Sequence, residues 1–126
     1  SGLAIALLFL CACTLAQPYP QRTVRIIVPF TTGGGTDFIA RLLGAKLSAT
    51  LGQQFIVENR VGAGSTLGTE VALRSPPDGY TLLLTSGSFA VNPSIYKKMP
   101  YDTLRDFCTL GELGAGVSVI GSVGAP

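Results

Sequence analysis

Three consecutive glycines, Gly33 to Gly35, stand where residue type and spacing first indicate chemistry. Thr31 and Asp37 flank them, and the aromatic Phe30 precedes them. Glycine lets the backbone take a positive φ and approach a ligand closely. A helix that begins after such a loop directs unpaired N–H groups and the positive end of its dipole at the loop. The stretch therefore predicts half of an anion-binding pocket.

Two later loops offer the same kinds of group. One is the glycine-bearing stretch from Asn59 to Ser65, and the other is the small, polar stretch from Ser86 to Asn92. Together the three loops supply backbone N–H groups, serine and threonine hydroxyls and the ring of Phe30. We expect this set to suit a carboxylate or a similar small anion.

The same residues have structural roles open to them as well. Asp37 can favour the helix dipole from the first turn, and the glycines can form a tight turn. Arg60 can be a solvated loop charge, or its guanidinium group can reach a ligand carboxylate. Ordinary roles in the core or in turns are equally open to Phe30, Ser86 and Ser88.

The chain lacks residues that several kinds of catalytic and cofactor-binding site require. The chain has no histidine, which excludes Ser-His-Asp and Cys-His catalysis and most zinc sites. No lysine follows Gly35, so the sequence does not match the Walker phosphate-loop motif. The run from Gly62 to Gly68 approximates a dinucleotide fingerprint, but its third glycine comes one residue late. We predict no catalytic residue, metal or cofactor, and keep a nucleotide-binding α/β enzyme as an alternative.

Alternating strands and helices must position these loops. The run from Thr23 to Pro29 alternates too little for a strand with one face in water, which favours a buried strand of a parallel sheet. A helix is predicted from Thr36, which can cap it, to the stop at Gly52. Its apolar residues recur at helical spacing and are Phe38, Ile39, Leu42, Leu43, Leu47 and Leu51.

The pattern then repeats. A strand from Gln54 to Asn59 leads to a helix from Thr66 to Arg74, and Pro76 to Gly79 ends that helix before a strand from Tyr80 to Thr85. This βαβαβ order predicts an α/β fold in which parallel strands end at one edge of the sheet, where ligands of open α/β sheets bind.

Beyond Asn92 and Pro93 the pattern weakens. It allows a helical turn from Ser94 to Met99 and a strand from Val117 to Ile120. The stretch between Gly111 and Gly116 is too rich in glycine to assign.

The first sixteen residues have the character of an export signal. Leu3 to Leu10 is uninterrupted apolar sequence, and a stretch of small residues leads to a predicted cleavage after Ala16. The run is too short to span a membrane. An alternative is a lipoprotein box that leaves a lipid on Cys13. Once Cys11 and Cys13 are removed, Cys108 stands alone and we expect it to be buried and structural. Export without a disulfide predicts the periplasm.

The charge pattern excludes one class of partner. The formal charge is only +2, and no basic run exceeds Lys97-Lys98. We therefore predict no binding to nucleic acid.

These motifs together resemble one family. From Tyr19 to Phe107 the chain is similar, in order and spacing, to the extracytoplasmic solute receptors of tripartite tricarboxylate transporters, also called Bug receptors. The motifs that carry the resemblance are Val28-Pro29-Phe30, Gly33-Gly34-Gly35-Thr36-Asp37, Leu51-Gly52-Gln53, Val57-Glu58-Asn59-Arg60, Gly62-Ala63-Gly64, Pro77-Asp78-Gly79-Tyr80-Thr81-Leu82-Leu83 and Asn92-Pro93.

The resemblance implies a two-lobed, monomeric receptor with a type II periplasmic binding protein-like fold. Such a receptor closes on a small carboxylic acid and delivers it to membrane permease subunits, without catalysis. Residues 1–16 would be the signal peptide and residues 17–126 the first part of lobe 1, with the second lobe absent. We expect a chain of this extent to bind weakly or not at all, and its full-length parent to bind. An envelope lipoprotein without a ligand is a further alternative.

The resemblance also implies which positions hold the carboxylate. Those that match the family's ligand loops are Phe30, Thr31, Gly33, Gly34, Gly35 and Asp37, followed by Gly64 and Ser65, and then Ser86 and Ala90. Two departures stand out. Val61 replaces a usual proline, and the match is poor after Phe107.

Overall fold

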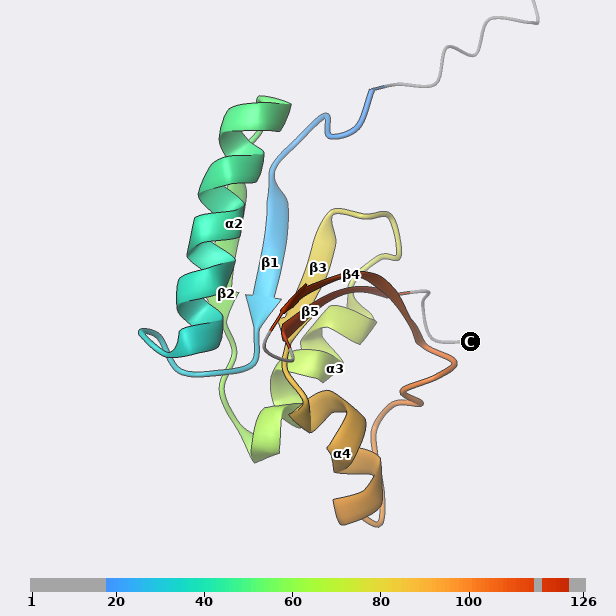
Figure 1. Cartoon of the computed structure of the whole chain (residues 1–126). Coiled ribbons are helices and arrows are strands. Elements are labelled where there is room, and N and C mark those ends of the chain that lie inside the picture. The colour runs from blue at the N-terminus through green and yellow to red at the C-terminus, as the bar shows by residue number, and fades with distance from the viewer. Residues whose placement is uncertain (1–17, 115–116, 123–126) are drawn as a thin grey trace, which may run out of the picture.

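The computed structural model describes residues 18–114 and 117–122 as a five-stranded sheet with helices packed on it (Figure 1). The expected signal peptide, residues 1–16 with Cys11 and Cys13, lies outside the described residues. In chain order the elements are β1 (Val24–Val28), α2 (Gly35–Leu51), β2 (Phe55–Asn59), the 3₁₀ turn η1 (Ala63–Ser65), α3 (Thr66–Arg74), β3 (Thr81–Thr85), α4 (Ser88–Ile95), β4 (Phe107–Gly114) and β5 (Val117–Ser122). Within the described ranges, none of the helices has the length and apolar character needed to cross a bilayer.

The sheet has the order β2-β1-β3-β5-β4. As the βαβαβ pattern predicts, β1 pairs in parallel with both β2 and β3, and Ile26 lies between Val57 and Leu82. The direction of the last two strands, which the sequence pattern leaves open, is antiparallel. β5 runs antiparallel to β3, and β4 runs antiparallel to β5. β4 and β5 are too close in sequence for a crossover, and strands joined by so short a connection can only pair antiparallel.

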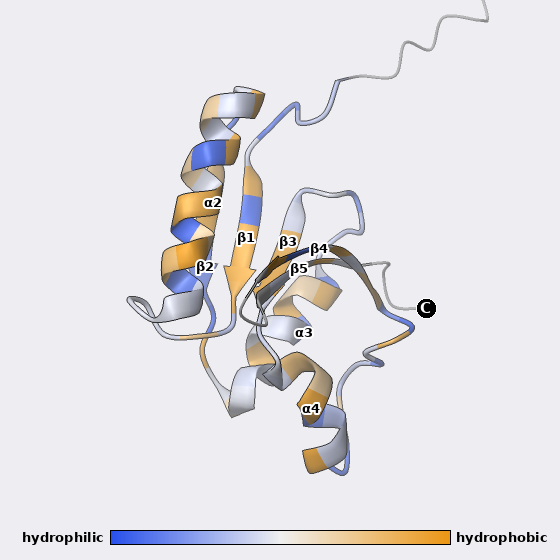
Figure 2. Cartoon of the chain, viewed as in Figure 1, coloured by the Kyte–Doolittle hydropathy of each residue, from blue (hydrophilic) through white to orange (hydrophobic). Residues whose placement is uncertain are grey.

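The central strands bury both of their faces, because α2 covers one face of the sheet and α3 the other (Figure 1). Successive residues of a strand point to opposite faces. Ile26 and Val28 accordingly pack in the cluster under α2, whereas Ile27 and Leu83 pack with Leu73 of α3. Figure 2 shows hydrophobic residues along most of β1. All residues of β1 except Arg25 are buried, which confirms the prediction of a buried strand.

Helix α2 begins one residue earlier than predicted, at Gly35. Its N-cap is Gly34, and no side chain caps it, so the expected role of Thr36 is wrong. The predicted stop is confirmed, since Gly52 follows with a left-handed φ of 74° and donates its N–H to the carbonyl of Ser48.

The apolar residues of α2 divide between two faces. Ile39, Leu43 and Leu47, spaced four apart, pack against the sheet. Phe38 and Leu42 lie on the neighbouring stripe and are 67% and 57% exposed. The apolar periodicity therefore predicts the helix, but it overstates how much of the helix is buried.

The chain after β3 differs most from prediction. A helix, α4, spans Ser88–Ile95 where only a turn from Ser94 was expected. The glycine-rich stretch is part of β4 as far as Gly114. The predicted strand at Val117 is confirmed and extends to Ser122. Cys108 lies on β4 and is exposed, so its predicted burial is wrong. An edge strand with one open face leaves that side chain in solvent.

Candidate functional site

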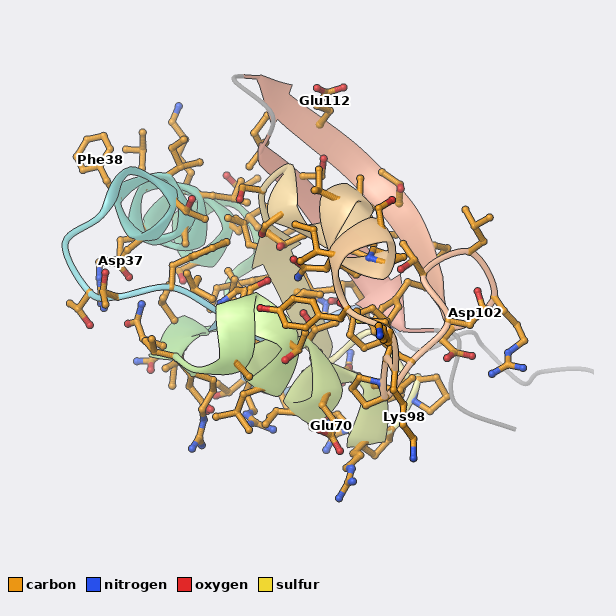
Figure 3. The ribbon with its side chains drawn as sticks, turned by 90° about the horizontal axis from the view of Figure 1, so that it is seen from below. Asp37, Phe38, Glu70, Lys98, Asp102 and Glu112 are labelled. Atoms are coloured by element: carbon orange, nitrogen blue, oxygen red, sulfur yellow. The ribbon has the colours of Figure 1, made fainter. Side chains whose placement is uncertain are left out.

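The loops that follow the three parallel strands meet at one edge of the sheet, as predicted. They enclose an open pocket of about 450 Å³. Figure 3 views the molecule from the end at which the β1 arrow of Figure 1 points. The pocket is lined by Pro29, Phe30 and Thr31 after β1, by the consecutive residues Val61, Gly62, Ala63, Gly64 and Ser65 after β2, and by Ser88 and Asn92 of α4.

The second loop has an unusual backbone. Four successive residues have positive φ, namely Gly62 (145°), Ala63 (48°), Gly64 (62°) and Ser65 (78°). Two of them are not glycine, so the surrounding structure must hold them in this sparsely populated region. This turn presents the loop to the pocket and leads directly into α3.

Side chains from two helices hold that turn. Asn92 of α4 donates through its Nδ2 to the carbonyl of Gly64 at 2.9 Å and to the Oγ of Ser65 at 3.1 Å. Thr69 of α3 donates its hydroxyl to the carbonyl of Ser65 at 2.9 Å. Asn92, Ser65 and Thr69 are each at least 95% buried. The turn is therefore fixed from behind by a buried polar cluster.

Gly68 explains the late glycine of the second motif. A Cβ at this position would lie 2.7 Å from the carbonyl oxygen of Arg60 and 2.7 Å from the Cβ of Pro29. Real Cβ atoms do not come so close, and only glycine allows α3 to approach the ends of β1 and β2. The spacing that approximates a nucleotide fingerprint thus serves close helix packing in this fold.

The carboxylate of Asp37 closes the first loop. Asp37 is 2% exposed; its Oδ2 accepts the N–H of Gly33 at 2.9 Å and the Nε–H of Arg41 at 3.0 Å. Its Oδ1 accepts the Nδ2 of Asn59 at 2.9 Å, and that nitrogen also donates to the carbonyl of Phe30. The Gly33 bond, followed by the Arg41 bond, lowers the pKa of Asp37 to about 2. The group is ionised and fully engaged in holding the loop.

The structure separates the predicted site residues into two groups. Phe30, Thr31, Gly64 and Ser65 line the pocket. Outside its wall lie Gly33, Gly34, Gly35 and Asp37, which form the loop and helix start beside it, and Ser86, which precedes α4. Figure 3 shows Asp37 next to that first loop. Ala90 lines a different pocket, of about 560 Å³, between α4 and the stretch from Met99 to Leu104.

Six residues of the wall are not among the individually predicted site residues, namely Pro29, Val61, Gly62, Ala63, Ser88 and Asn92. Ser88 and Asn92 lie in the third predicted loop, but neither of them was assigned to the ligand from the sequence. The missed signal is the helix itself: α4 begins at Ser88, and residues four apart on a helix share a face, so Ser88 and Asn92 both look toward the pocket.

No charged side chain is among the residues that line the pocket. Arg60, the one cation considered for it, lies 3.4 Å from the carboxylate of Glu58, which also accepts two hydrogen bonds from Arg25 at 2.8 Å. The Arg25 bonds are the main cause of the lowered pKa of Glu58. In residues 18–114 and 117–122, no cluster of acidic, cysteine or histidine side chains could hold a metal. The pocket therefore offers neutral hydrogen-bonding groups.

The sheet and the pocket at its carboxyl edge have the architecture of a lobe of a periplasmic binding protein, and solved structures of that class superpose on it. The periplasmic binding protein BugD is 44% identical with a TM-score of 0.70, and the match covers 74% of this chain and 31% of BugD. An R. palustris protein solved with adipate is 37% identical with a TM-score of 0.71 (74% and 31% covered). MatC from Rhodopseudomonas palustris, with bound malate, is 39% identical with a TM-score of 0.69 (73% and 32% covered).

The family follows from the sequence comparison. The family described as tripartite tricarboxylate transporter family receptor matches residues 39–121, and the chain belongs to it. Protein BugT of Bordetella pertussis is 43% identical over 115 residues, which are 90% of this chain and 35% of BugT. The chain spans about a third of the length of the relatives it matches. The resemblance identified from the motifs is thereby confirmed.

Proposed function

We propose that the protein carrying this chain is a periplasmic receptor that captures a small carboxylate and delivers it to a membrane permease of the tripartite tricarboxylate type, without catalysing a reaction. Residues 1–16 serve as its export signal, and residues 17–126 supply the first part of its first lobe. The observation that carries the proposal is the pocket where the three loops meet, lined by hydroxyl and amide groups and free of acidic side chains.

The chemistry of the wall favours an anion. Thr31 and the hydrogen-bonded Ser65–Ser88 pair can each donate one hydroxyl proton, and the loops add backbone N–H groups. The nearby acid, Asp37, is turned into its own loop, where three donors hold it and one of them, the cationic Arg41, offsets its charge. The relatives solved with adipate and with malate support a dicarboxylate as the ligand class.

An open pocket explains why a second lobe is needed. Hydrogen bonds to a carboxylate gain little in contact with water, because the ligand exchanges them for bonds to solvent. A lobe that closes over the pocket excludes that water and adds contacts to the far end of the ligand. We therefore assign tight binding to the two-lobed protein, and only one face of the site to this chain.

Ligand-dependent thermal stabilisation of the complete protein tests the proposal. We expect one or more members of a panel of dicarboxylates and aromatic carboxylates to raise Tm, since a ligand at a hundred times its Kd stabilises by about 2.7 kcal/mol. The diamide of malate is the matched control, as it keeps the shape and removes both charges. No shift across the panel would contradict the proposal, and a shift with NAD or ATP alone would favour the nucleotide-binding alternative.

A further inference from the structure

Asn92 belongs to a motif that the proposed binding site leaves unexplained. It is 4% exposed, and its Nδ2 donates both to the carbonyl of Gly64 and to the Oγ of Ser65. A carbonyl oxygen can only accept, so the nitrogen of the amide must face Gly64. The orientation of the Asn92 amide is thus settled by chemistry, and Ser65 receives a proton from it.

The hydroxyl protons of Ser65 and Ser88 determine whether the pair can donate a hydrogen bond into the pocket. The Oγ atoms of Ser65 and Ser88 lie 3.3 Å apart, and both residues line the pocket. Two serine hydroxyls have two protons, and the bond between them uses one, whichever serine donates it. Because Asn92 donates to Ser65 and takes no proton from it, the second hydroxyl proton stays free. The pair therefore presents a donor to the pocket.

We propose that Asn92 is a positioning residue that keeps one hydroxyl proton of the Ser65–Ser88 pair available to the ligand, and so selects hydrogen-bond acceptors such as carboxylates. This inference rests on the proposed function and adds to it the group that sets the polarity of the pocket. The same amide holds Gly64 and Ser65 in their left-handed conformations, so it fixes the shape of the wall as well.

Tyr101 is a titratable group that lies near Asn92 and Thr69. Burial raises the pKa of the Tyr101 phenol, an effect that Asn92 and Thr69 oppose, and the phenol stays neutral at physiological pH. The phenol therefore brings no charge to the Ser65–Ser88 pair at this pH.

Asn92→Asp reverses that polarity with almost no change of shape. An ionised carboxylate can only accept, so it takes the proton of Ser65 and faces the carbonyl of Gly64 without a hydrogen bond. Ser88 then donates to Ser65, and no hydroxyl proton is left for the pocket. Asn92→Ala, which removes both bonds and adds no charge, is the matched control.

The first measurement needs no ligand. In the complete Asn92→Asp protein, followed by NMR titration and by unfolding at several pH values, we expect burial to raise the pKa of the introduced carboxyl above its ordinary range. A raised pKa in the folded state means that the variant comes closest to wild type at low pH and loses stability as pH rises through that pKa. The Asn92→Ala variant should lack this pH dependence. A carboxyl that titrates in its ordinary range overturns the inference.

The second measurement compares binding by calorimetry at neutral pH, with malate and adipate as probes and their diamides as controls. Removal of one donor to a charged group costs roughly tenfold in affinity, so we expect about that loss for Ser88→Ala and a larger one for Asn92→Asp. Wild-type affinity in the folded Asn92→Asp protein overturns the inference. If wild type binds no carboxylate, both the proposed function and the proposed ligand selection are wrong. The NMR titration then still tests whether the side chain at position 92 contacts Gly64 and Ser65.

Discussion

Asp37→Asn removes a buried negative charge and leaves the shape of the side chain nearly unchanged. In the native loop two carboxylate oxygens receive three donors, from Gly33, Arg41 and Asn59. An asparagine keeps one of those oxygens and replaces the other with an NH₂ group. At least one donor then faces another donor, and the loop beside the pocket loses its charge-assisted bonds.

The magnitude follows from the pKa of Asp37. Its fall from 3.8 to about 2 corresponds to about 2.4 kcal/mol of free energy of unfolding. The side chain of Arg41, the charged partner of Asp37, is 50% exposed, so solvent screens part of this free energy. We expect about 1 to 2 kcal/mol. Because the folded-state pKa is the lower one, this stability is present above pH 4 and is lost as pH falls toward 2.

Chemical denaturation at a series of pH values from 7 to 2.5 measures the effect. Asp37→Asn should be less stable than wild type at pH 7, and the difference should shrink as the pH falls. Glu70→Gln is the matched control, since it also removes one carboxylate, but from a solvent-exposed pair with Arg74 on α3. It should change the free energy of unfolding by less than about 0.5 kcal/mol. A difference between wild type and Asp37→Asn that stays constant from pH 7 to pH 3 would refute the reasoning.

Two further substitutions test the packing around the site by chemical denaturation. Gly68→Ala should destabilise the protein by about 2 kcal/mol or more, because the added Cβ meets the carbonyl of Arg60 and the ring of Pro29. The control, Gly35→Ala, should be neutral or stabilising, because its Cβ has open space and the position is helical. Equal effects of the two substitutions would contradict this prediction. Thr85→Val should stabilise the protein by about 1 kcal/mol, because the Oγ1 of Thr85 is buried without a hydrogen-bond partner in residues 18–114 and 117–122. A loss of stability would contradict this prediction, since it would mean that the hydroxyl makes a hydrogen bond.

The βαβαβ core could be predicted from sequence because each signal in it is local. The strand of Val24–Val28 reads as a buried apolar run, Gly52 ends a helix, and Pro76 with Pro77 ends another. Parallel pairing then follows from the helical crossovers, and it brings the loops to one edge of the sheet. The order of elements thus predicts which loops form the candidate site. The family resemblance adds the individual positions, of which Phe30, Thr31, Gly64 and Ser65 line the pocket.

The remainder depends on tertiary contacts that leave no local pattern. α4 contains Pro93 and little amphipathic character, so its sequence does not predict a helix. β4 contains two glycines and is a strand because β5 pairs with it. One of the three groups that hold Asp37 inward is Asn59, which is distant in sequence. That Asp37 lies outside the wall while Asn92 lies within it could therefore be read only from the fold.

The irregular pairing of β4 has a consequence for how the sheet avoids growing. β4 is an edge strand of the described sheet, and an edge presents free N–H and C=O groups that can recruit a strand from another molecule. Its register with β5 shifts between Thr109 and Gly111 and again between Glu112 and Gly114. Such irregularities break the even spacing of hydrogen-bonding groups that an incoming strand would need, and Glu112 adds an exposed charge. In the sheet formed by residues 18–114 and 117–122, the two shifts make the unpaired side of β4 a poor template for an added strand.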